Sequence, residues 1–325
     1  MLILSDTHLH STHPVVGEDY LNLGISALQQ IRQFAIENDE KTIIHLGDTF
    51  QLKDRIPSRV WNAFFQELAE WEKLGFTSYF LKGNHDYQTD ATIEAFKIAP
   101  HSIPILTSEI HSIEEYKCMF VPYGEPLVKE ICNFIFMHDY FRGKTTLPND
   151  IVAMDGKNME EVSNYGNYII AGHSHKFQEL IKDKVFHIGS PYQTTFNEVG
   201  QEKFFGQVKN GELIWHNFKF PEFKIVDLDD PNTADQNVEG CYLKAVYSKL
   251  SDADARYIKN ELLAWGAKAV KLEPQSKIIV KNRIKSKKGE KIDYLQEYIK
   301  ATNNGLNANS LHRIGIEIIE KTVIE

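Results

Sequence analysis

The chain has 325 residues, 42% of them hydrophobic and 25% charged, a composition typical of globular proteins that excludes disordered, collagen-like and coiled-coil chains. Its 45 acidic and 36 basic residues give a net charge of −9, so the overall field repels nucleic acid, and DNA binding requires a local basic patch, a metal ion or a partner. No apolar run approaches the roughly 18 residues of a membrane helix, no secretory signal is recognisable, and the three cysteines form no motif, so we expect a cytoplasmic protein without a membrane span.

Short apolar strands alternate with amphipathic helices in the first part of the chain. The sequence predicts strands over 2–5, 42–46 and 78–81 and helices over about 18–38 and 58–74. This alternation indicates βαβ units and a sheet with helices packed on its faces.

Strands dominate from about residue 103 onward. They are predicted over 116–121, 133–137 and 168–171, followed by a hairpin within 177–188 and a second that pairs 203–209 with 212–219. Asn210-Gly211 joins the second hairpin and favours a type I′ turn. Together the patterns indicate an α/β fold, specifically a mixed α/β sandwich.

A small α/β module follows the sandwich. Residues 221–237 are rich in proline and acidic side chains, which is typical of a linker. Beyond it we predict a strand over about 240–248 and a helix that begins after Ser251 with a capping box and ends near Gly266. Strands over 268–273 and 277–284 complete the module.

Two short helical stripes joined by Asn303-Asn304-Gly305 predict a helix-loop-helix at the end of the chain. We therefore expect three domains, over residues 1–220, 221–285 and 286–325.

Five polar clusters come directly after predicted strands. They are Asp6-Thr7-His8, Gly47-Asp48, Gly83-Asn84-His85-Asp86, His138 and Gly172-His173-Ser174-His175. Strand ends at one edge of a sandwich converge, so residues far apart in sequence can build one pocket. Carboxylate, amide and imidazole groups without a thiolate are the ligands that two divalent transition metals require. The glycines leave room for sharp turns and a close approach of the backbone.

This ordered set resembles the motifs of the calcineurin-like metallophosphoesterases, D-x-H, G-D, G-N-H-[DE], H and G-H-x-H, over about residues 1–200. The resemblance implies a four-layer β-sandwich flanked by helices. It also implies two metal sites that share Asp48, one held by Asp6, His8, Asp48 and His175 and the other by Asp48, Asn84, His138 and His173. His85 is then left near the scissile phosphate, where it can protonate the leaving oxygen, and Asp86 is a candidate to orient its ring.

The charge of such a centre favours a phosphodiester substrate. Two divalent ions bring four positive charges, and Asp6 and Asp48 bring two negative ones, which leaves +2, or +1 once a bridging water is ionised. A singly charged diester matches that remainder.

Further residues narrow the choice within the family. Thr49-Phe50-Gln51-Leu52 stands where the protein Ser/Thr phosphatases carry Asp-Arg-Gly, which disfavours that branch. The Gly-Ser-Pro element within 189–198 resembles SbcD-type DNA repair nucleases and their phage recombination counterparts, as does the order of linker, small α/β cap and helix-loop-helix. The family often has an acidic residue at the place of Gln51 and a glycine at that of His10, but neither departure removes a ligand.

The SbcD-type resemblance implies an exonuclease, with endonuclease activity as a further expectation, that works with an SbcC-type coiled-coil ATPase. Mn²⁺ is the metal that the resemblance favours, and Mg²⁺, Fe²⁺ and Zn²⁺ stay open. In that family the cap contacts DNA and the helix pair docks on the ATPase.

The tail carries the candidate contacts. A basic run is either a solvated strand edge or a strip that contacts DNA phosphates, and its residues are Lys281, Arg283, Lys285, Lys287 and Lys288. The apolar side chains of the helix pair either close a terminal bundle or, as we favour, dock on the ATPase; they are Leu295, Ile299, Leu311, Ile314 and Ile318.

The helix over 58–74 has a wide apolar face, which consists of Trp61, Phe64, Phe65, Leu68 and Trp71. This face suits burial against the sheet or, by the resemblance, a homodimer interface, and we favour the interface. His45 lies in an apolar strand and is expected to be structural.

Two other functions stay open. One is a phosphodiesterase for cyclic nucleotides or other small diesters, and the other is a metal-stabilised scaffold without activity, against which the complete ligand set argues.

Overall fold

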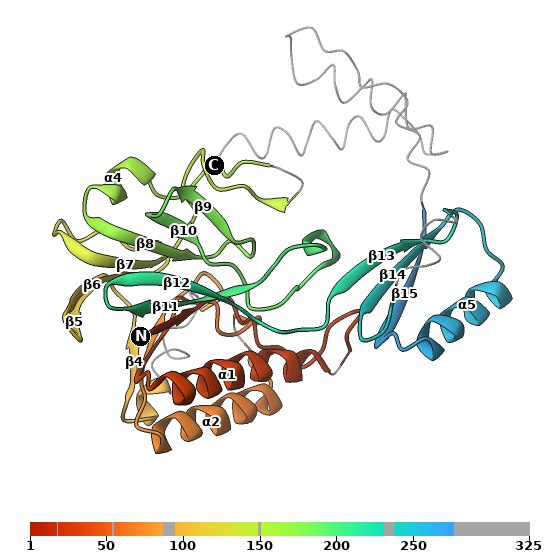
Figure 1. Cartoon of the computed structure of the whole chain (residues 1–325), viewed down its shortest axis with the longest axis horizontal. Coiled ribbons are helices and arrows are strands. Elements are labelled where there is room, and N and C mark those ends of the chain that lie inside the picture. Colours follow the sequence, from red (N-terminus) through yellow and green to blue (C-terminus); the bar gives the residue numbers. More distant parts are fainter. Residues whose placement is uncertain (18, 54, 87–94, 149–150, 231–236, 276–325) are drawn as a thin grey trace, which may run out of the picture. The chain divides into compact units, whose positions relative to one another are not determined.

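The computed structural model describes residues 1–17, 19–53, 55–86, 95–148, 151–230 and 237–275. Residues Met1–Pro274 cluster into one unit, in which the described strands form two sheets of six strands and one of three (Figure 1). None of the helices in these ranges is long and apolar enough to cross a membrane.

The first sheet has the strand order β12-β11-β1-β2-β3-β4. Its strands are β1 (Leu2–Leu4), β2 (Thr42–His45), β3 (Thr77–Leu81), β4 (Ser102–Ile105), β11 (Phe204–Lys209) and β12 (Glu212–Asn217). The strands β1 to β4 pair in parallel, whereas β11 pairs antiparallel with both β1 and β12. The helices α1 (Asp19–Asn38) and α2 (Ser58–Lys73) connect β1, β2 and β3, which confirms the predicted βαβ units.

The second sheet has the strand order β5-β6-β7-β8-β10-β9. Its strands are β5 (Glu109–Ile113), β6 (Tyr116–Val121), β7 (Cys132–His138), β8 (Gly166–Gly172), β9 (Gln178–Ile181) and β10 (Val185–His187). The central strands are parallel, and the edge strands β5 and β9 are antiparallel to their neighbours. The predicted hairpin within 177–188 is the pair β9–β10, whereas the sequence did not single out β4 or β5.

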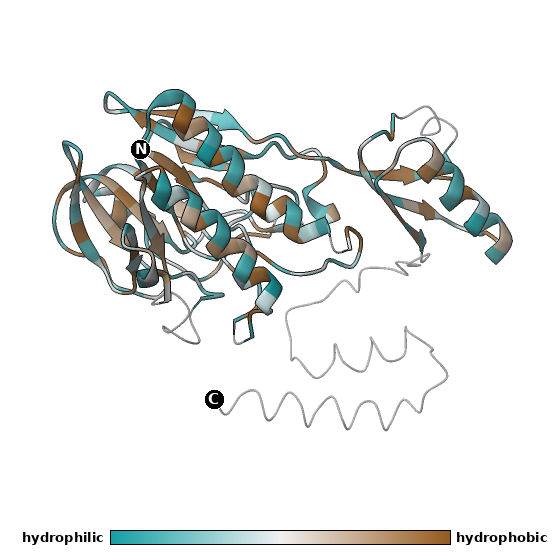
Figure 2. Cartoon of the chain, turned by 90° about the horizontal axis from the view of Figure 1, so that it is seen from below, coloured by the Kyte–Doolittle hydropathy of each residue, from teal (hydrophilic) through white to brown (hydrophobic). Residues whose placement is uncertain are grey.

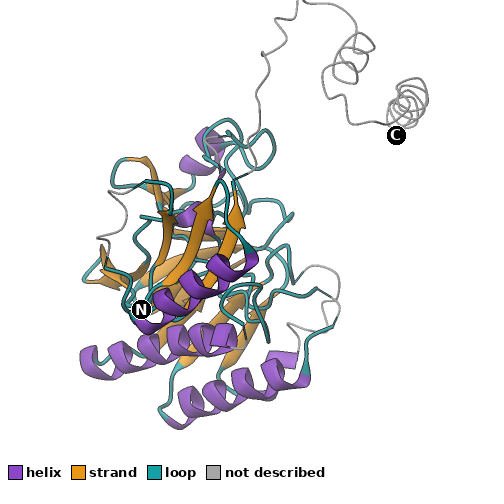
Figure 3. Cartoon of the chain, turned by 90° about the vertical axis from the view of Figure 1, so that its right-hand side faces the viewer, coloured by secondary structure: helices purple, strands orange, loops and turns teal. Residues whose placement is uncertain are grey.

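Alternating side chains bury both faces of each sheet. Ile3 of β1 packs in one apolar cluster with Phe134 and Phe136 of β7, so this cluster lies between the two sheets. Leu2 and Leu4 point the other way and join the cluster formed with α1 and α2. Figure 3 shows long helices, in purple, beside the strands, in orange.

The outer face of the second sheet is covered by α4 (Met159–Ser163) and by loops. Ile135 and Met137 of β7 pack there with Met159 and Val162 of α4. The layers are therefore helices, sheet, sheet, and a short helix with loops, which confirms the expected α/β sandwich flanked by helices.

The helices α1 and α2 lie side by side on the first sheet (Figure 2). The buried apolar residues of α2 recur at helical spacing and are Val60, Phe64, Leu68 and Trp71. The Trp71 indole donates to Glu67 at 2.9 Å, and Glu67 pairs with Arg32 of α1 at 3.2 Å. Phe64, Leu68 and Trp71 of the apolar face noted in the sequence are therefore buried inside the chain. The other two residues of that face, Trp61 and Phe65, are half-buried.

A three-stranded parallel sheet forms a small module with its own apolar core. Its elements are β13 (Phe223–Asp227), β14 (Tyr242–Tyr247), α5 (Asp252–Ala264) and β15 (Ala269–Pro274). The Ser251 hydroxyl accepts the backbone N–H of Asp254 at 3.2 Å, which confirms the predicted helix cap.

The prediction of a linker is wrong for 223–227, because β13 lies there and pairs with β14 along its whole length. Phe223 and Val226 are buried, so the segment has the apolar residues of a strand, and the acidic and proline-rich composition belongs to its flanks. The domain boundary at residue 220 stays a prediction.

Several predictions about the end of the chain lie outside the described residues. They concern the strand over 277–284, the basic residues Lys281, Arg283, Lys285, Lys287 and Lys288, and the helix pair with Leu295, Ile299, Leu311, Ile314 and Ile318.

Candidate metal centre

The polar clusters lie at the carboxyl ends of strands from both large sheets. The residues are, by strand, Asp6 and His8 after β1, Asp48 after β2, Asn84 and His85 after β3, His138 at the end of β7, and His173 and His175 after β8. The loops after β1 and β2 run together, because the backbone N–H of His8 donates to the Asp48 carbonyl at 3.0 Å.

Asp6, His8 and His175 form one group whose ligand atoms all lie within 4.8 Å of one another. His8 Nε2 is 3.7 Å from Asp6 Oδ1 and 2.9 Å from His175 Nε2. The buried Asp6 carboxylate also accepts the backbone N–H of His173 at 3.0 Å, which ties the end of β1 to the end of β8.

Asp48 lies between this group and a second one. Its Oδ2 is 3.5 Å from His8 Nε2, and its Oδ1 is 3.4 Å from His138 Nε2. The ligand atoms of Asp48, His138 and His173 again lie within 4.8 Å of one another, and Asn84 Oδ1 is 3.1 Å from His138 Nε2. One carboxylate thus stands between two sets of nitrogen donors, where a bridging ligand would stand.

The contact between His8 and His175 fits a bound cation. Two imidazole nitrogens at 2.9 Å are either joined by one proton or drawn together by a cation that both lone pairs face. His8 Nδ1 is buried and has no hydrogen-bond partner among the described residues, so this ring is held in place at a cost that metal binding would offset. The set of carboxylate, imidazole and amide donors fits a divalent metal.

Four candidate ligands have backbones in the left-handed region. The φ angles are 54° at Asp6, 42° at His8, 54° at Asp48 and 80° at His173. Such angles are uncommon outside glycine and cost on the order of 1–3 kcal/mol each. Of the eight non-glycine residues with positive φ in the described ranges, these four lie at one place, so strain is concentrated where donor atoms are gathered.

Two glycines allow the loops to approach the centre, as their place in the motifs predicted. A Cβ at Gly83 would lie 2.2 Å from Asp48 Oδ1 and 2.4 Å from Asp48 N. A Cβ at Gly172 would lie 2.2 Å from Ser5 Oγ and 2.9 Å from His138 Nδ1. A side chain at either position would push a candidate ligand or its support out of place.

His85 lies beside Asp48, but its neighbour Asp86 does not orient its ring. The His85 backbone N–H donates to Asp48 Oδ1 at 2.8 Å, and the ring Nδ1 contacts the Gln51 carbonyl at 2.6 Å. Asp86 Oδ2 instead accepts the backbone N–H groups of Asp48 at 2.8 Å and Gly83 at 3.0 Å. The expected role of Asp86 is therefore wrong: Asp86 orders the loops around Asp48, and the Gln51 carbonyl holds His85.

Burial and charge shift the titration of the central residues in opposite directions. Burial alone would raise the pKa of Asp48, yet the charge on His138 and a hydrogen bond to it hold this pKa well below its usual value. Burial alone would lower the pKa of His138, but Asp48 raises it to about 9. Burial and the charge of His138 lower the pKa of His173 to about 3, and burial and the charge of Asp48 raise the pKa of Asp86 to about 7.

Three residues near His175 have a role that the sequence does not predict, although Thr194 and Glu198 lie within the Gly-Ser-Pro element over 189–198. Thr194, Glu198 and Lys203 form a buried polar group behind the His175 ring, and no ligand motif marks them.

His45 has the structural role expected of it, since its ring contacts the Thr7 hydroxyl at 3.0 Å.

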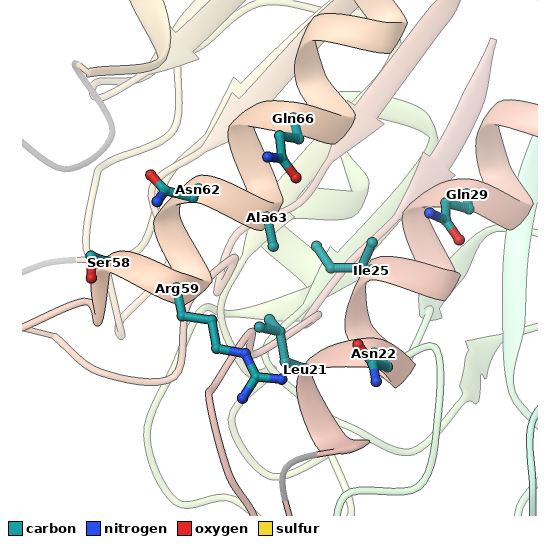
Figure 4. Close-up of a pocket in the computed structure, with 9 residues that line it drawn as sticks. All are labelled: Leu21, Asn22, Ile25, Gln29, Ser58, Arg59, Asn62, Ala63 and Gln66. Atoms are coloured by element: carbon teal, nitrogen blue, oxygen red, sulfur yellow. The ribbon is translucent and has the colours of Figure 1, made fainter.

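A pocket of about 470 Å³ opens beside His173 and His175, two candidate ligands that follow strand β8 of the second sheet. Its other lining residues include Tyr140, Lys176 and Asn197. A larger hollow of about 730 Å³ lies between α1 and α2 (Figure 4). Its lining contains no candidate ligand and consists of Leu21, Asn22, Ile25, Gln29, Ser58, Arg59, Asn62, Ala63 and Gln66. The pocket beside His173 is thus the one of the two that adjoins the centre.

The calcineurin-like phosphoesterase family model matches residues 1–258, so the chain belongs to this family. Members of the family are metal-dependent phosphoesterases, and the described residues contain three overlapping groups of ligand atoms that could hold their divalent metals. Two are the groups described above, and the third consists of His8, Asp48 and His85.

Several solved structures resemble the chain at low identity. An archaeal phosphodiesterase is 16% identical, covers 67% of this chain and 99% of its own, and has a TM-score of 0.38. A protein of Thermus thermophilus is 13% identical with the same coverage and a TM-score of 0.39. The phosphoesterase Yfce of E. coli is 13% identical, covers 67% of this chain and 98% of its own, and has a TM-score of 0.30. Comparison with curated protein sequences gives no match.

Proposed function

We propose that the chain is a DNA phosphodiesterase with two divalent metal ions, an exonuclease with endonuclease activity in addition, and the nuclease subunit of an SbcC/SbcD-type repair or recombination complex. The observation that carries the metal centre is the position of Asp48, whose two oxygens lie within 3.5 Å of His8 and His138 in adjoining groups of ligand atoms. The DNA substrate rests on the Gly-Ser-Pro element and on the order of cap and tail in the sequence.

The proposed ligands follow the resemblance and the geometry together. Asp6, His8, Asp48 and His175 would hold one ion, and Asp48, Asn84, His138 and His173 the other. When bound, the ions neutralise the non-bridging phosphate oxygens and lower the pKa of the attacking water. Mn²⁺ is the proposed metal, Fe²⁺ and Zn²⁺ suit the same donors, and Mg²⁺ stays an alternative.

His85 is the proposed proton donor. Its Nδ1 contacts the Gln51 carbonyl, so Nδ1 carries a proton that it donates to this oxygen. Nε2 is then the ring nitrogen that is left to interact with the substrate. When the ring is doubly protonated, Nε2 donates to the oxygen that leaves the phosphorus.

The partners are proposals from the sequence. We propose that the basic run contacts DNA phosphates, that the terminal helix pair docks on an SbcC-type ATPase, and that the chain forms a homodimer through α2. A cytoplasmic location belongs to the same proposal, and the free thiols of Cys118, Cys132 and Cys241 are in keeping with a reducing compartment.

The test is release of nucleotides from linear double-stranded and single-stranded DNA with Mn²⁺, for the wild-type protein and for His85→Asn. We expect the variant to lose hydrolysis and to keep its metal content, since His85 is not among the proposed ligands, although a nitrogen of its ring lies within 4.8 Å of the ligand atoms of His8 and Asp48. A full nuclease rate in His85→Asn would exclude the role assigned to this residue.

A phosphodiesterase for small diesters is the second candidate, because the pocket of about 470 Å³ beside His173 has the size of a small-molecule site. Bis-p-nitrophenyl phosphate and cyclic AMP in the same assay separate the two candidates. Turnover of these diesters without degradation of DNA would favour the second, and absence of turnover on every diester would leave a scaffold without activity.

A further inference from the structure

Glu198 and Lys203 form a buried ion pair next to His175. The side chains are each 7% exposed, and Lys203 Nζ lies 2.5 Å from Glu198 Oε2. Buried ion pairs add little net stability compared with apolar residues of similar volume. Stability alone therefore does not account for this pair, and its contacts with His175 suggest another role.

One end of the pair reaches the imidazole ring of His175. The Thr194 hydroxyl lies 3.1 Å from His175 Nδ1 and donates its own proton to Glu198 Oε1 at 2.5 Å. Because that proton is committed to Glu198, Thr194 Oγ1 can only accept from Nδ1. The proton of the neutral ring thus resides on Nδ1, and the lone pair on Nε2 faces His8.

The other end of the pair holds the backbone of His175. Lys203 Nζ donates to the His175 carbonyl at 2.9 Å and to Ser190 Oγ at 3.0 Å. The backbone N–H of Ser190 donates to the same carbonyl at 3.1 Å. The ring and the main chain of His175 are therefore fixed by the same buried pair.

We propose that Glu198, anchored by Lys203 and acting through Thr194, is the residue that positions His175 and sets its tautomer for metal binding. Hydrogen-bonded partners outside the ligand shell orient metal-binding histidines, and their loss typically weakens metal binding by about 10–100-fold. This inference rests on the metal centre proposed above but is independent of the substrate.

Two variants test the role of Glu198. Thr194→Val removes the hydroxyl that links the ring to Glu198 and leaves the ion pair intact. The double variant Glu198→Leu/Lys203→Met removes both charges together, so no unpaired charge stays buried. Glu202→Gln is the matched control, because Glu202 lies in the same segment but is exposed.

The measurement is titration of the metal-free protein with Mn²⁺ by calorimetry, with the melting temperature in EDTA recorded for each variant. We expect one binding event to weaken about 10–100-fold in both test variants and to stay unchanged in Glu202→Gln. Long-range ¹H–¹⁵N spectra of histidine-labelled protein should place the His175 proton on Nδ1 in the wild type and show a mixture of tautomers in Thr194→Val.

The outcomes separate this inference from the proposed function. If the wild type binds Mn²⁺ and the two test variants bind it equally well with the same tautomer, Glu198 does not position His175, although the metal centre stands. If the wild type binds no divalent ion, both proposals fail. A variant that melts lower in EDTA but keeps wild-type affinity assigns Glu198 a purely structural role and also overturns the inference.

Discussion

His187 is a fully buried imidazole that is satisfied only in its neutral form. Its Nδ1 lies 3.2 Å from the Gly172 carbonyl and its Nε2 lies 2.8 Å from the Thr145 hydroxyl, so one nitrogen donates and the other accepts. Burial lowers the pKa of His187 to about 4, below the 6.5 of an unfolded histidine. As the pH falls, the His187 imidazole is therefore protonated in the unfolded chain before it is protonated in the folded one. The free energy of unfolding consequently decreases between pH 6.5 and about 4.

We expect His187→Gln to flatten this part of the pH profile of the metal-free protein. In the wild type, His187 should account for a loss of about 3 kcal/mol in the free energy of unfolding between pH 6.5 and about 4, since one pKa unit corresponds to about 1.4 kcal/mol. Urea unfolding in EDTA at several pH values measures it, with the exposed His101→Gln as the control for loss of one imidazole. Equal slopes in wild type and His187→Gln would show that another group governs acid unfolding.

At the level of elements, α2 presents two faces with different tasks. Phe64 is 1% exposed and its ring packs against those of Phe50, Phe80 and Phe96. The half-buried Phe65 instead lines a hollow of about 510 Å³ that also includes Pro100. The first face builds the core, and the second is the one available to the proposed homodimer.

The two faces predict different outcomes for adjacent substitutions. Phe64→Ala should lower the free energy of unfolding by about 3–5 kcal/mol, because it opens a cavity in the core. Phe65→Glu should convert the proposed dimer into a monomer in sedimentation experiments. It should lower the melting temperature less than Phe64→Ala does, because Phe65 is only half-buried and contacts the rings of Phe64 and Phe96 from the edge of the core. A Phe65→Glu protein that sediments as the wild type does would mean that this face of α2 is not the interface.

The elements that the sequence predicts well are those with a local signature. The ligand loops follow short apolar strands and carry a glycine or an Asx residue at the turn, and the type I′ turn at Asn210-Gly211 appears as expected, with φ angles of 53° and 80°. The strand β13 was missed because its acidic and proline-rich flanks dominate the composition, while its pairing with β14 is a long-range contact.

The contacts that the sequence could not predict join segments far apart in the chain. Asp86 serves the backbone of Asp48, 38 residues away, and His85 is held by a main-chain carbonyl that has no residue signature. The link from Glu198 to His175 passes through Thr194, and no spacing rule marks such a relay. Local patterns thus locate the donors of the centre, whereas the groups that orient them emerge only from the fold.

At the scale of the whole molecule, the net charge of −9 opposes the approach of DNA. Binding then depends on a segment whose local charge is reversed, and the basic run near residues 281–288 is the one that the sequence offers. A small diester needs no such segment, because the charge of the proposed metal centre would attract it.

Replacing the five basic residues with glutamine should therefore weaken DNA binding and leave turnover of bis-p-nitrophenyl phosphate unchanged. The residues are Lys281, Arg283, Lys285, Lys287 and Lys288. Each lost contact with a duplex phosphate should reduce the slope of log K against log salt by about 0.9.

The control must change the net charge equally at another place. It replaces five exposed lysines of the described residues with glutamine: Lys129, Lys182, Lys209, Lys259 and Lys268. If the basic run contacts phosphates, the control variant retains most of the salt dependence that the test variant loses, because only phosphate contacts release counterions. Equal losses in the two variants would mean that DNA senses only the overall field, and the basic run would then be a solvated edge of the chain.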